Sequence, residues 1–207
     1  MNTHEMSHTF IEEMGDKNRL NKWIFDTIQP YIKGRTMEMG SHGGAISSLF
    51  VDHDLPIHLS DGLEGNRQRL VERFRDTLLI RMVHDIDFLR EDFVNTYRSS
   101  FGAFSTVLAV NITEHGYYNQ LALNNAKHLL RLGGHLMIVA PAYTALLNGL
   151  EEDLDEWKKH NALVIKEIMG SNVEGLKVRY FNWQALPGLH SRTFGLSTLA
   201  IFRKMAL

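Results

Sequence analysis

Cysteine is absent from this sequence of 207 residues. Its absence excludes disulfides, cysteine-ligated zinc, iron–sulfur clusters and thiol catalysis, and it makes a reducing cytoplasm the predicted location. Long apolar runs are also missing. The longest, FSTVLAV and HLMIVA, fall far short of the roughly 20 residues that span a bilayer. The first ten residues lack the basic and apolar regions of a signal peptide, so we expect no membrane partner.

An excess of charge of one sign is lacking as well. There are 22 Lys and Arg residues against 24 Asp and Glu, which gives a formal net charge of −2. That balance predicts no broad basic surface for nucleic acid. Apolar residues make up 44% and charged residues 22%, as in ordinary globular proteins. The length fits one domain over residues 1–207, in which residues 1–33 form an N-terminal arm and helix that could act as a lid.

Helix-like and strand-like segments alternate about seven times. Helices are expected over residues 17–33 (ended or kinked by Pro30), from residue 45 onward, and over 64–74, 117–130 and 143–169, and Gly133 and Gly134 read as a helix stop. Strands are expected at Arg35–Met39, Ile57–Ser60, Thr77–Val83 (buried), Phe104–Val110, His135–Ala140, Leu176–Phe181 and Ser197–Arg203. The alternation predicts an α/β, Rossmann-like, seven-stranded and mostly parallel sheet, with helices on both faces and an antiparallel C-terminal hairpin at one edge.

A glycine-rich turn follows the first expected strand, with Gly40, Gly43 and Gly44. Its spacing matches neither the dinucleotide fingerprint nor the P-loop. Glu38 just before the turn would oppose a pyrophosphate and suits a cationic ligand, such as an amino group or a sulfonium. Asp61, at the end of the second strand, can accept hydrogen bonds from ribose hydroxyls. The sequence therefore predicts a nucleoside site here.

These residues resemble motifs of the class I S-adenosylmethionine-dependent methyltransferases, in particular small bacterial members often encoded with glycosyltransferase or natural-product genes. The likeness extends over about residues 18–188. The segment EMGSHGG at 38–44 resembles the first motif and Asp61 the acid of the second. Asp85 matches the acid of the third motif, with Asp87 as the alternative. NITEH at 111–115 resembles the fourth motif, LLRLGG at 129–134 the segment after the next helix, and NKWIFDTIQPYIKGR an early helix.

The resemblance implies that S-adenosylmethionine is the cofactor. Glu38 would face its amino group, Asp61 its ribose, and Asp85 its adenine end. The full set of implied cofactor-binding residues is Glu38, Gly40, Ser41, His42, Gly44, Asp61, Gly62, Asp85, Ile86, Asn111, Ile112, Arg19 and Trp23. His42 departs from the motif because it replaces the middle glycine. Its side chain turns aside, weakens cofactor binding or indicates another ligand.

His115 is the candidate general base, because the fourth strand should end at the ligand-binding edge and histidine titrates near neutral pH. Its alternative is a structural or cofactor-contacting role. Tyr143 and His160 are candidates for the acceptor side. The predicted function is methyl transfer to an oxygen or nitrogen of a small-molecule acceptor. The alternative is a protein that binds the cofactor without methyl transfer, either a cyclase-like enzyme or a non-catalytic partner.

Three further features are interpreted as structural. His4 and His8 have a spacing that a helix would bring together, but no metal is predicted. The basic stretch Arg67–Arg75 reads as the exposed face of a helix. The apolar loop around 183–192 fits either a pocket wall or a subunit contact, which leaves a homodimer open. No N-P-P-Y or D-P-P-Y signature follows the fourth strand, so no nucleic acid partner is expected.

Overall fold

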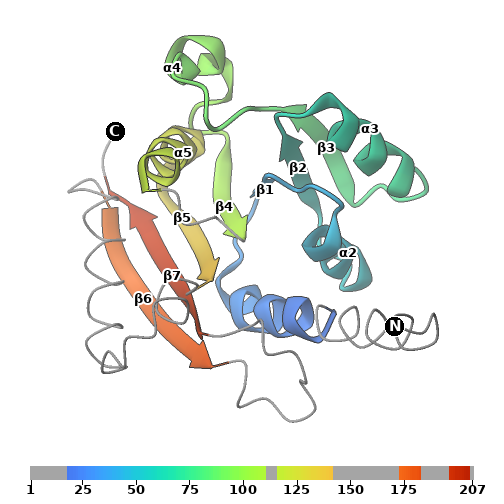
Figure 1. Ribbon diagram of the computed structural model, residues 1–207, viewed down its shortest axis with the longest axis horizontal. Coiled ribbons are helices and arrows are strands. Elements are labelled where there is room, and N and C mark those ends of the chain that lie inside the picture. The colour runs from blue at the N-terminus through green and yellow to red at the C-terminus, as the bar shows by residue number, and fades with distance from the viewer. Residues whose placement is uncertain (1–17, 111–115, 142–172, 183–195, 206–207) are drawn as a thin grey trace, which may run out of the picture.

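The computed structural model describes residues 18–110, 116–141, 173–182 and 196–205. The strands are β1 (Thr36–Met39), β2 (Ile57–Asp61), β3 (Ile80–Asp85), β4 (Phe104–Val110), β5 (Leu130–Pro141), β6 (Val173–Asn182) and β7 (Leu196–Lys204). They form one seven-stranded sheet in the order β3-β2-β1-β4-β5-β7-β6, which Figure 1 shows in ribbon form. The helices are a segment over residues 18–28, η1 (Gln29–Tyr31), α2 (Ala45–Asp52), α3 (Glu64–Arg73), α4 (Phe93–Thr96), η2 (Arg98–Ser100) and α5 (Gly116–Leu129).

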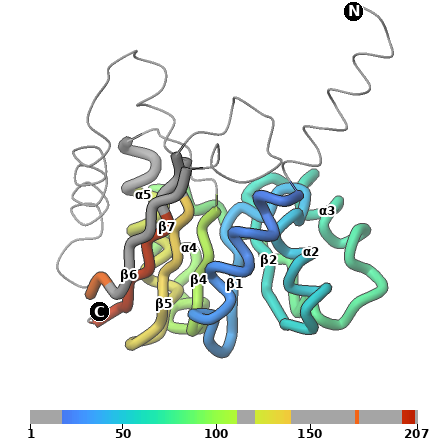
Figure 2. The backbone as a smooth tube through the Cα atoms, turned by 90° about the horizontal axis from the view of Figure 1, so that it is seen from below, coloured from blue at the N-terminus to red at the C-terminus, as the bar shows by residue number. Residues whose placement is uncertain are grey.

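Strands β1 to β5 pair in parallel, whereas β7 runs antiparallel to both β5 and β6. In Figure 2, strands β5, β4, β1 and β2 lie side by side across the middle of the molecule. The order reverses between β1 and β4, and in an open α/β sheet ligands bind at the carboxyl ends of the strands beside such a reversal. The prediction of a Rossmann-like sheet with an antiparallel C-terminal edge is confirmed.

One face of the sheet is covered by the helix over 18–28 together with α2 and α3. The helix over 18–28 buries Leu20, Ile24, Phe25 and Ile28, which recur at helical spacing. A 3₁₀ turn with Pro30 near its start replaces the α-helix after Ile28, as proline without an N–H requires. The cluster continues through Phe50 of α2 and Leu70 of α3 onto β2, β4, β5 and β7.

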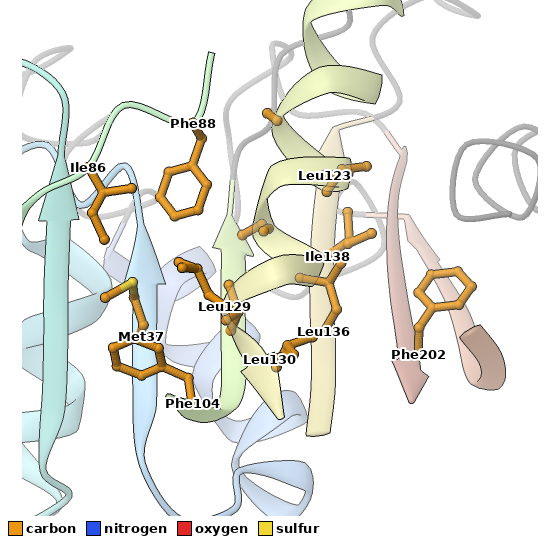
Figure 3. Close-up of a cluster of buried hydrophobic side chains, with 14 of the residues drawn as sticks. Met37, Ile86, Phe88, Phe104, Leu123, Leu129, Leu130, Leu136, Ile138 and Phe202 are labelled. Carbon is orange, nitrogen blue, oxygen red and sulfur yellow. The ribbon is translucent and has the colours of Figure 1, made fainter. Parts of the chain in front are cut away.

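The other face is covered mainly by α5. Its side chains Ala122, Leu123, Ala126 and Leu129 pack against Met37 of β1 and against residues of β4, β5 and β7. Figure 3 shows side chains from α5 and from the strands meeting in this layer. Strands β4, β5 and β7 therefore contribute alternate residues to two separate cores.

Two boundaries differ from the prediction. The third strand runs from Ile80 to Asp85 and not from Thr77 to Val83, and it is an edge strand rather than a buried one. Leu78 lies before it and is 87% exposed, while Met82 within it is 54% exposed. The apolar run therefore predicted a strand in the right region. Its bounds and its exposure, however, were decided by its pairing, because among the described residues β3 has β2 as a neighbour on one side and no strand on the other.

The predicted helix stop at Gly133 and Gly134 is wrong in position. Helix α5 ends at Leu129, and β5 begins at once with Leu130. Gly133 lies within this strand with φ of 72°, where the pairing with β4 shifts register between Phe104 and Thr106. The glycines thus allow an irregularity in the strand rather than ending the helix. Within the described ranges, no helix is long and apolar enough to cross a membrane.

Candidate functional site

The turn between β1 and α2 requires glycine at its last position. Gly44 caps α2 with φ of 74°, and a Cβ added there would lie 2.6 Å from Cε2 of Phe74. The backbone N–H of Gly44 donates to the carbonyl of Ser41 over 2.7 Å, which closes the turn. Positive φ values also occur at Gly40 (63°) and at His42 (46°), so the chain enters the left-handed region three times within five residues. This tight path brings the turn next to the end of β2.

Glu38 is a buried acid in β1 at the base of this turn. The Ser47 hydroxyl of α2 donates to its Oε2 atom. Burial raises the pKa of Glu38 to about 7 from an ordinary value of 4.5, although hydrogen bonds from Ser47 and Ser41 oppose that rise. Its hydrogen-bonding neighbours are thus neutral hydroxyls. A buried carboxyl in such surroundings suits a ligand that brings its own positive charge.

Asp61 ends β2 and carries the second buried carboxylate. Its Oδ1 accepts from the Leu63 N–H over 2.9 Å and from the Asn66 side-chain amide over 3.1 Å. Its Oδ2 accepts from the His42 N–H over 3.1 Å. The carboxylate therefore ties the glycine-rich turn to the start of α3. The Ser60 carbonyl accepts from the Ser41 N–H, and the Glu38 carbonyl accepts from the Ser60 hydroxyl. These two bonds also join β2 to β1 and the turn.

Arg67 of α3 joins β2 to β3. Its guanidinium donates to the carbonyls of Asp61 and Gly62 and lies 3.0 Å from Oδ1 of Asp85. Asp85 is mostly exposed at the end of β3, while the next residue, Ile86, is buried in the α5-side core. The predicted residues of the second and third motifs are thus neighbours, and Arg67 contacts both of them.

Arg73 holds the outer side of the turn. Its guanidinium donates to the Gly43 carbonyl and, over 2.7 Å, to the Ser48 hydroxyl. The interpretation of Arg67–Arg75 as one exposed face is therefore wrong for Arg67, which is half-buried, whereas Arg73 is exposed as expected. Helical geometry could have suggested the contact between Arg67 and the end of β2. Arg67 follows Asp61 by six residues, and side chains on a helix lean toward its N-terminus.

The structure brings nine predicted residues together at the ends of β1, β2 and β3: Glu38, Gly40, Ser41, His42, Gly44, Asp61, Gly62, Asp85 and Ile86. Arg19 and Trp23 lie on the helix over 18–28, with Arg19 exposed and Trp23 partly buried against the core on that face of the sheet. Five others lie outside the described residues: Asn111, Ile112, His115, Tyr143 and His160.

A second polar cluster, which the sequence did not suggest, lies on the α5-side face of the sheet. Arg35 Nε donates to His58 Nε2 over 3.0 Å, and His58 Nδ1 is 2.9 Å from His84 Nε2. Because arginine only donates, His58 must accept at Nε2 and donate from Nδ1. Burial lowers the pKa of His58 to about 4, helped by the charges of Arg35, His84 and Arg81, and burial also lowers the pKa of His84.

Metal ligands are sparse in this region. Across the residues that the structure describes, no group of three or more His, Asp or Glu side chains could hold a metal ion. His58 and His84 instead use their ring nitrogens on each other and on Arg35.

Solved structures with this architecture are numerous. The N-methyltransferase NodS from Bradyrhizobium japonicum WM9 superimposes with a TM-score of 0.62 at 15% identity, over 93% of this chain and 98% of that one. The same enzyme in complex with S-adenosyl-L-homocysteine gives 0.59 at 15% identity, over 91% and 86%. The [4+2]-cyclase SpnF gives 0.62 at 13% identity, over 92% and 82%. No family model and no curated protein matches the sequence.

These likenesses establish the fold and not the reaction. The chain has the class I S-adenosylmethionine-dependent methyltransferase fold, with the strand order and the antiparallel β7 described above. NodS and SpnF share this fold although one is a methyltransferase and the other a cyclase. The site must therefore be argued from its own residues.

Proposed function

We propose that the chain binds S-adenosylmethionine at the carboxyl ends of β1, β2 and β3. The observation that carries this proposal is the pair of buried carboxyl groups, Glu38 and Asp61, on either side of the glycine-rich turn. Glu38 would hold the amino group, Asp61 the ribose, and Asp85 with Ile86 the adenine. Gly40, Ser41, His42, Gly44 and Gly62 would line the site, and Asn111, Ile112, Arg19 and Trp23 complete the proposed set.

The residues suit this cofactor in charge and in shape. Glu38 gains a cationic partner for a carboxyl that burial otherwise holds near neutrality. Asp61 keeps an acceptor position on Oδ2 for a hydroxyl, since within the described residues the hydrogen-bond donor to that atom is the His42 N–H. Within the described residues, no positively charged side chain is hydrogen-bonded to Glu38, so none would repel a sulfonium there.

We propose methyl transfer to an oxygen or nitrogen of a small-molecule acceptor as the activity. The bound cofactor supplies a methyl group on a positively charged sulfur. The chain's own task is to align the acceptor and to remove its proton. His115 is proposed as the base, with Tyr143 and His160 on the acceptor side. The known N-methyltransferase among the structural neighbours supports this class of reaction.

Calorimetric titration with S-adenosylmethionine and S-adenosylhomocysteine tests the proposed site. We expect micromolar binding that Asp61→Ala abolishes, because that variant removes the ribose acceptor and loosens the turn. Asp76→Ala is the matched control, since Asp76 is exposed and lies beyond α3. Binding that survives Asp61→Ala unchanged, or no binding by the wild type at millimolar ligand, contradicts the proposal.

A second function keeps the cofactor site without methyl transfer. It is favoured by His42, which occupies the middle-glycine position, and by the likeness to the cyclase SpnF. Measuring S-adenosylhomocysteine formation across a panel of small hydroxyl and amine acceptors separates the two. Turnover that His115→Gln removes supports the methyltransferase, whereas tight binding with no turnover for any acceptor supports the second function.

A further inference from the structure

The donors from the described residues leave one hydrogen-bond acceptor position open on Asp61. A carboxylate offers about four acceptor positions, two on each oxygen. The Leu63 N–H and the Asn66 amide fill Oδ1, and the His42 N–H takes one position on Oδ2. A ribose presents two neighbouring hydroxyls that both donate. Asp61 can therefore accept one of them, and the second hydroxyl needs another acceptor close by.

The imidazole of His42 provides that acceptor. Its Nδ1 lies 3.6 Å from Oδ2 of Asp61, and its side chain is 78% exposed. The Asn66 amide nitrogen lies 3.4 Å from the same Nδ1. An amide nitrogen only donates, so Nδ1 accepts and the ring proton is on Nε2. Two acceptors, Oδ2 of Asp61 and Nδ1 of His42, thus lie 3.6 Å apart.

The contact from Asn66 to His42 is easily exchanged. At 3.4 Å it is long for a hydrogen bond, whereas the bond from the same amide to Asp61 is 3.1 Å. A ligand hydroxyl can replace the longer contact while Asn66 keeps the shorter one. Asn66 thus orients both acceptors before a ligand arrives.

The backbone of His42 supports a role for its side chain. Its φ of 46° lies in the left-handed region, where glycine is favoured and histidine is among the few other residues found. Residues held in such conformations cluster at functional sites. A histidine where the resembling motif has glycine is accounted for if its side chain contacts the ligand.

We propose that His42 and Asp61 share the ribose of the ligand, with one hydroxyl donating to Oδ2 of Asp61 and the other to Nδ1 of His42. His42 is then a specificity residue that distinguishes ribose from deoxyribose. This inference rests on the proposed function, because it assumes that a nucleoside occupies the site.

The test compares S-adenosylhomocysteine with its 2′-deoxy and 3′-deoxy forms by calorimetry on the full chain. Both deoxy forms should bind the wild type about tenfold or more weakly, as expected for one lost hydrogen bond. His42→Gly should weaken S-adenosylhomocysteine about tenfold and leave one deoxy form unchanged, so that discrimination at that hydroxyl disappears. His42→Asn, which tolerates the same φ and keeps an acceptor oxygen, should restore it. Thermal melting of each variant checks the fold, and His42→Gly should melt no lower than the wild type because it removes the left-handed histidine.

A second readout does not depend on the variants. In ¹⁵N-labelled protein the Nδ1 signal of His42 should shift on adding S-adenosylhomocysteine, and less on adding the deoxy form that lacks its partner hydroxyl. If His42→Gly binds all three ligands with wild-type discrimination, this inference is overturned while the proposed function stands. If the wild type binds none of the three, both proposals are overturned.

Discussion

Two groups of buried ionisable side chains lie on opposite faces of β1 and β2, and burial moves their pKa values in opposite directions. Glu38 faces α2, and its pKa rises to about 7. His58 pairs in register with Met37 on the α5-side face, and its pKa falls to about 4. Both shifts favour the neutral form, because desolvation penalises whichever form carries charge.

The two groups differ in what surrounds them. Neutral hydroxyls are the hydrogen-bonding partners of Glu38, so a cationic ligand can still supply the missing charge. His58 lies between Arg35 and His84 in a chain whose donors and acceptors already match. A buried acid among neutral donors indicates a binding site, whereas a satisfied chain of donors indicates a structural role. The following predictions test that difference, from the largest expected effect to the smallest.

Replacing Gly44 should destabilise the glycine-rich turn that follows Glu38, on the face of the sheet opposite His58. Gly44→Ala places a Cβ 2.6 Å from the Phe74 ring at a φ of 74°. We expect a loss of about 3 kcal/mol in the free energy of unfolding, from left-handed strain and overpacking together. Urea unfolding measures it. Gly43→Ala is the matched control with a cost under about 0.5 kcal/mol, because a Cβ there meets nothing within 4 Å. Equal losses in the two variants would contradict the assigned strain.

Acid should destabilise the His58 side. The pKa of His58 is about 4 in the fold against 6.5 ordinarily, so its contribution to stability is complete above pH 6.5 and is lost as the pH falls toward 4. We expect a loss of about 2 kcal/mol over that range. The measurement is the difference in unfolding free energy between wild type and His58→Gln as a function of pH. The difference should shrink on acidification, and a difference that stays constant would contradict the lowered pKa of His58.

Glu38 should make ligand binding depend on pH around neutrality. An ammonium ligand needs the ionised carboxylate, whose fraction rises through pH 7. Affinity for S-adenosylhomocysteine should therefore rise about tenfold from pH 6 to pH 8. Glu38→Gln should bind weakly and without this slope, and the exposed Glu64→Gln should keep it. A slope that persists in Glu38→Gln would assign the titration to another group.

The same shift makes a prediction for stability without ligand. The contribution of Glu38 is present below pH 4.5 and is lost as the pH rises through 7. Glu38→Gln should therefore gain stability relative to the wild type between pH 5 and pH 8. The difference in unfolding free energy between wild type and variant should change with pH in opposite directions for Glu38→Gln and His58→Gln. Parallel profiles would remove the contrast between the two faces.

Arg67 should have the smallest effect. Its ion pair with Asp85 is half open to solvent, and such pairs contribute at most about 1 kcal/mol. Arg67→Met should weaken S-adenosylhomocysteine about threefold by loosening the ends of β2 and β3. Arg69→Met, exposed on the same helix, should leave affinity unchanged. Equal effects of the two variants would point to net charge instead of position.

The local parts of the site could be predicted because they depend on short stretches of chain. Gly40, Gly43 and Gly44 after a strand and before a helix indicate a tight turn from residue type alone. Asp61 could be placed because a short strand leads directly to it, and the carboxyl ends of parallel strands meet at one edge of the sheet. The structure places both as expected.

Other parts depend on which elements become neighbours. Thr77–Val83 looked like a buried strand because apolarity does not reveal whether a strand has one neighbour or two. Arg67 looked exposed because helical periodicity shows a polar face without showing the Asp61 and Gly62 carbonyls and the Asp85 carboxylate that this side chain contacts. The hydrogen-bonded series of Arg35, His58 and His84 joins three segments that are distant in sequence, so no local sequence pattern predicts it.

The sequence by itself determined the class of fold, the glycine-rich turn and the two acids that flank it. Alternating periodicity, glycine stereochemistry and the polarity of strand ends are all properties of nearby residues. Only the tertiary structure decided the pKa of Glu38, the remaining acceptor position on Asp61 and the placement of the His42 imidazole beside Asp61. Burial and hydrogen-bond partners are set by segments that meet only on folding, and those partners determine the charge and the acceptors that the site presents.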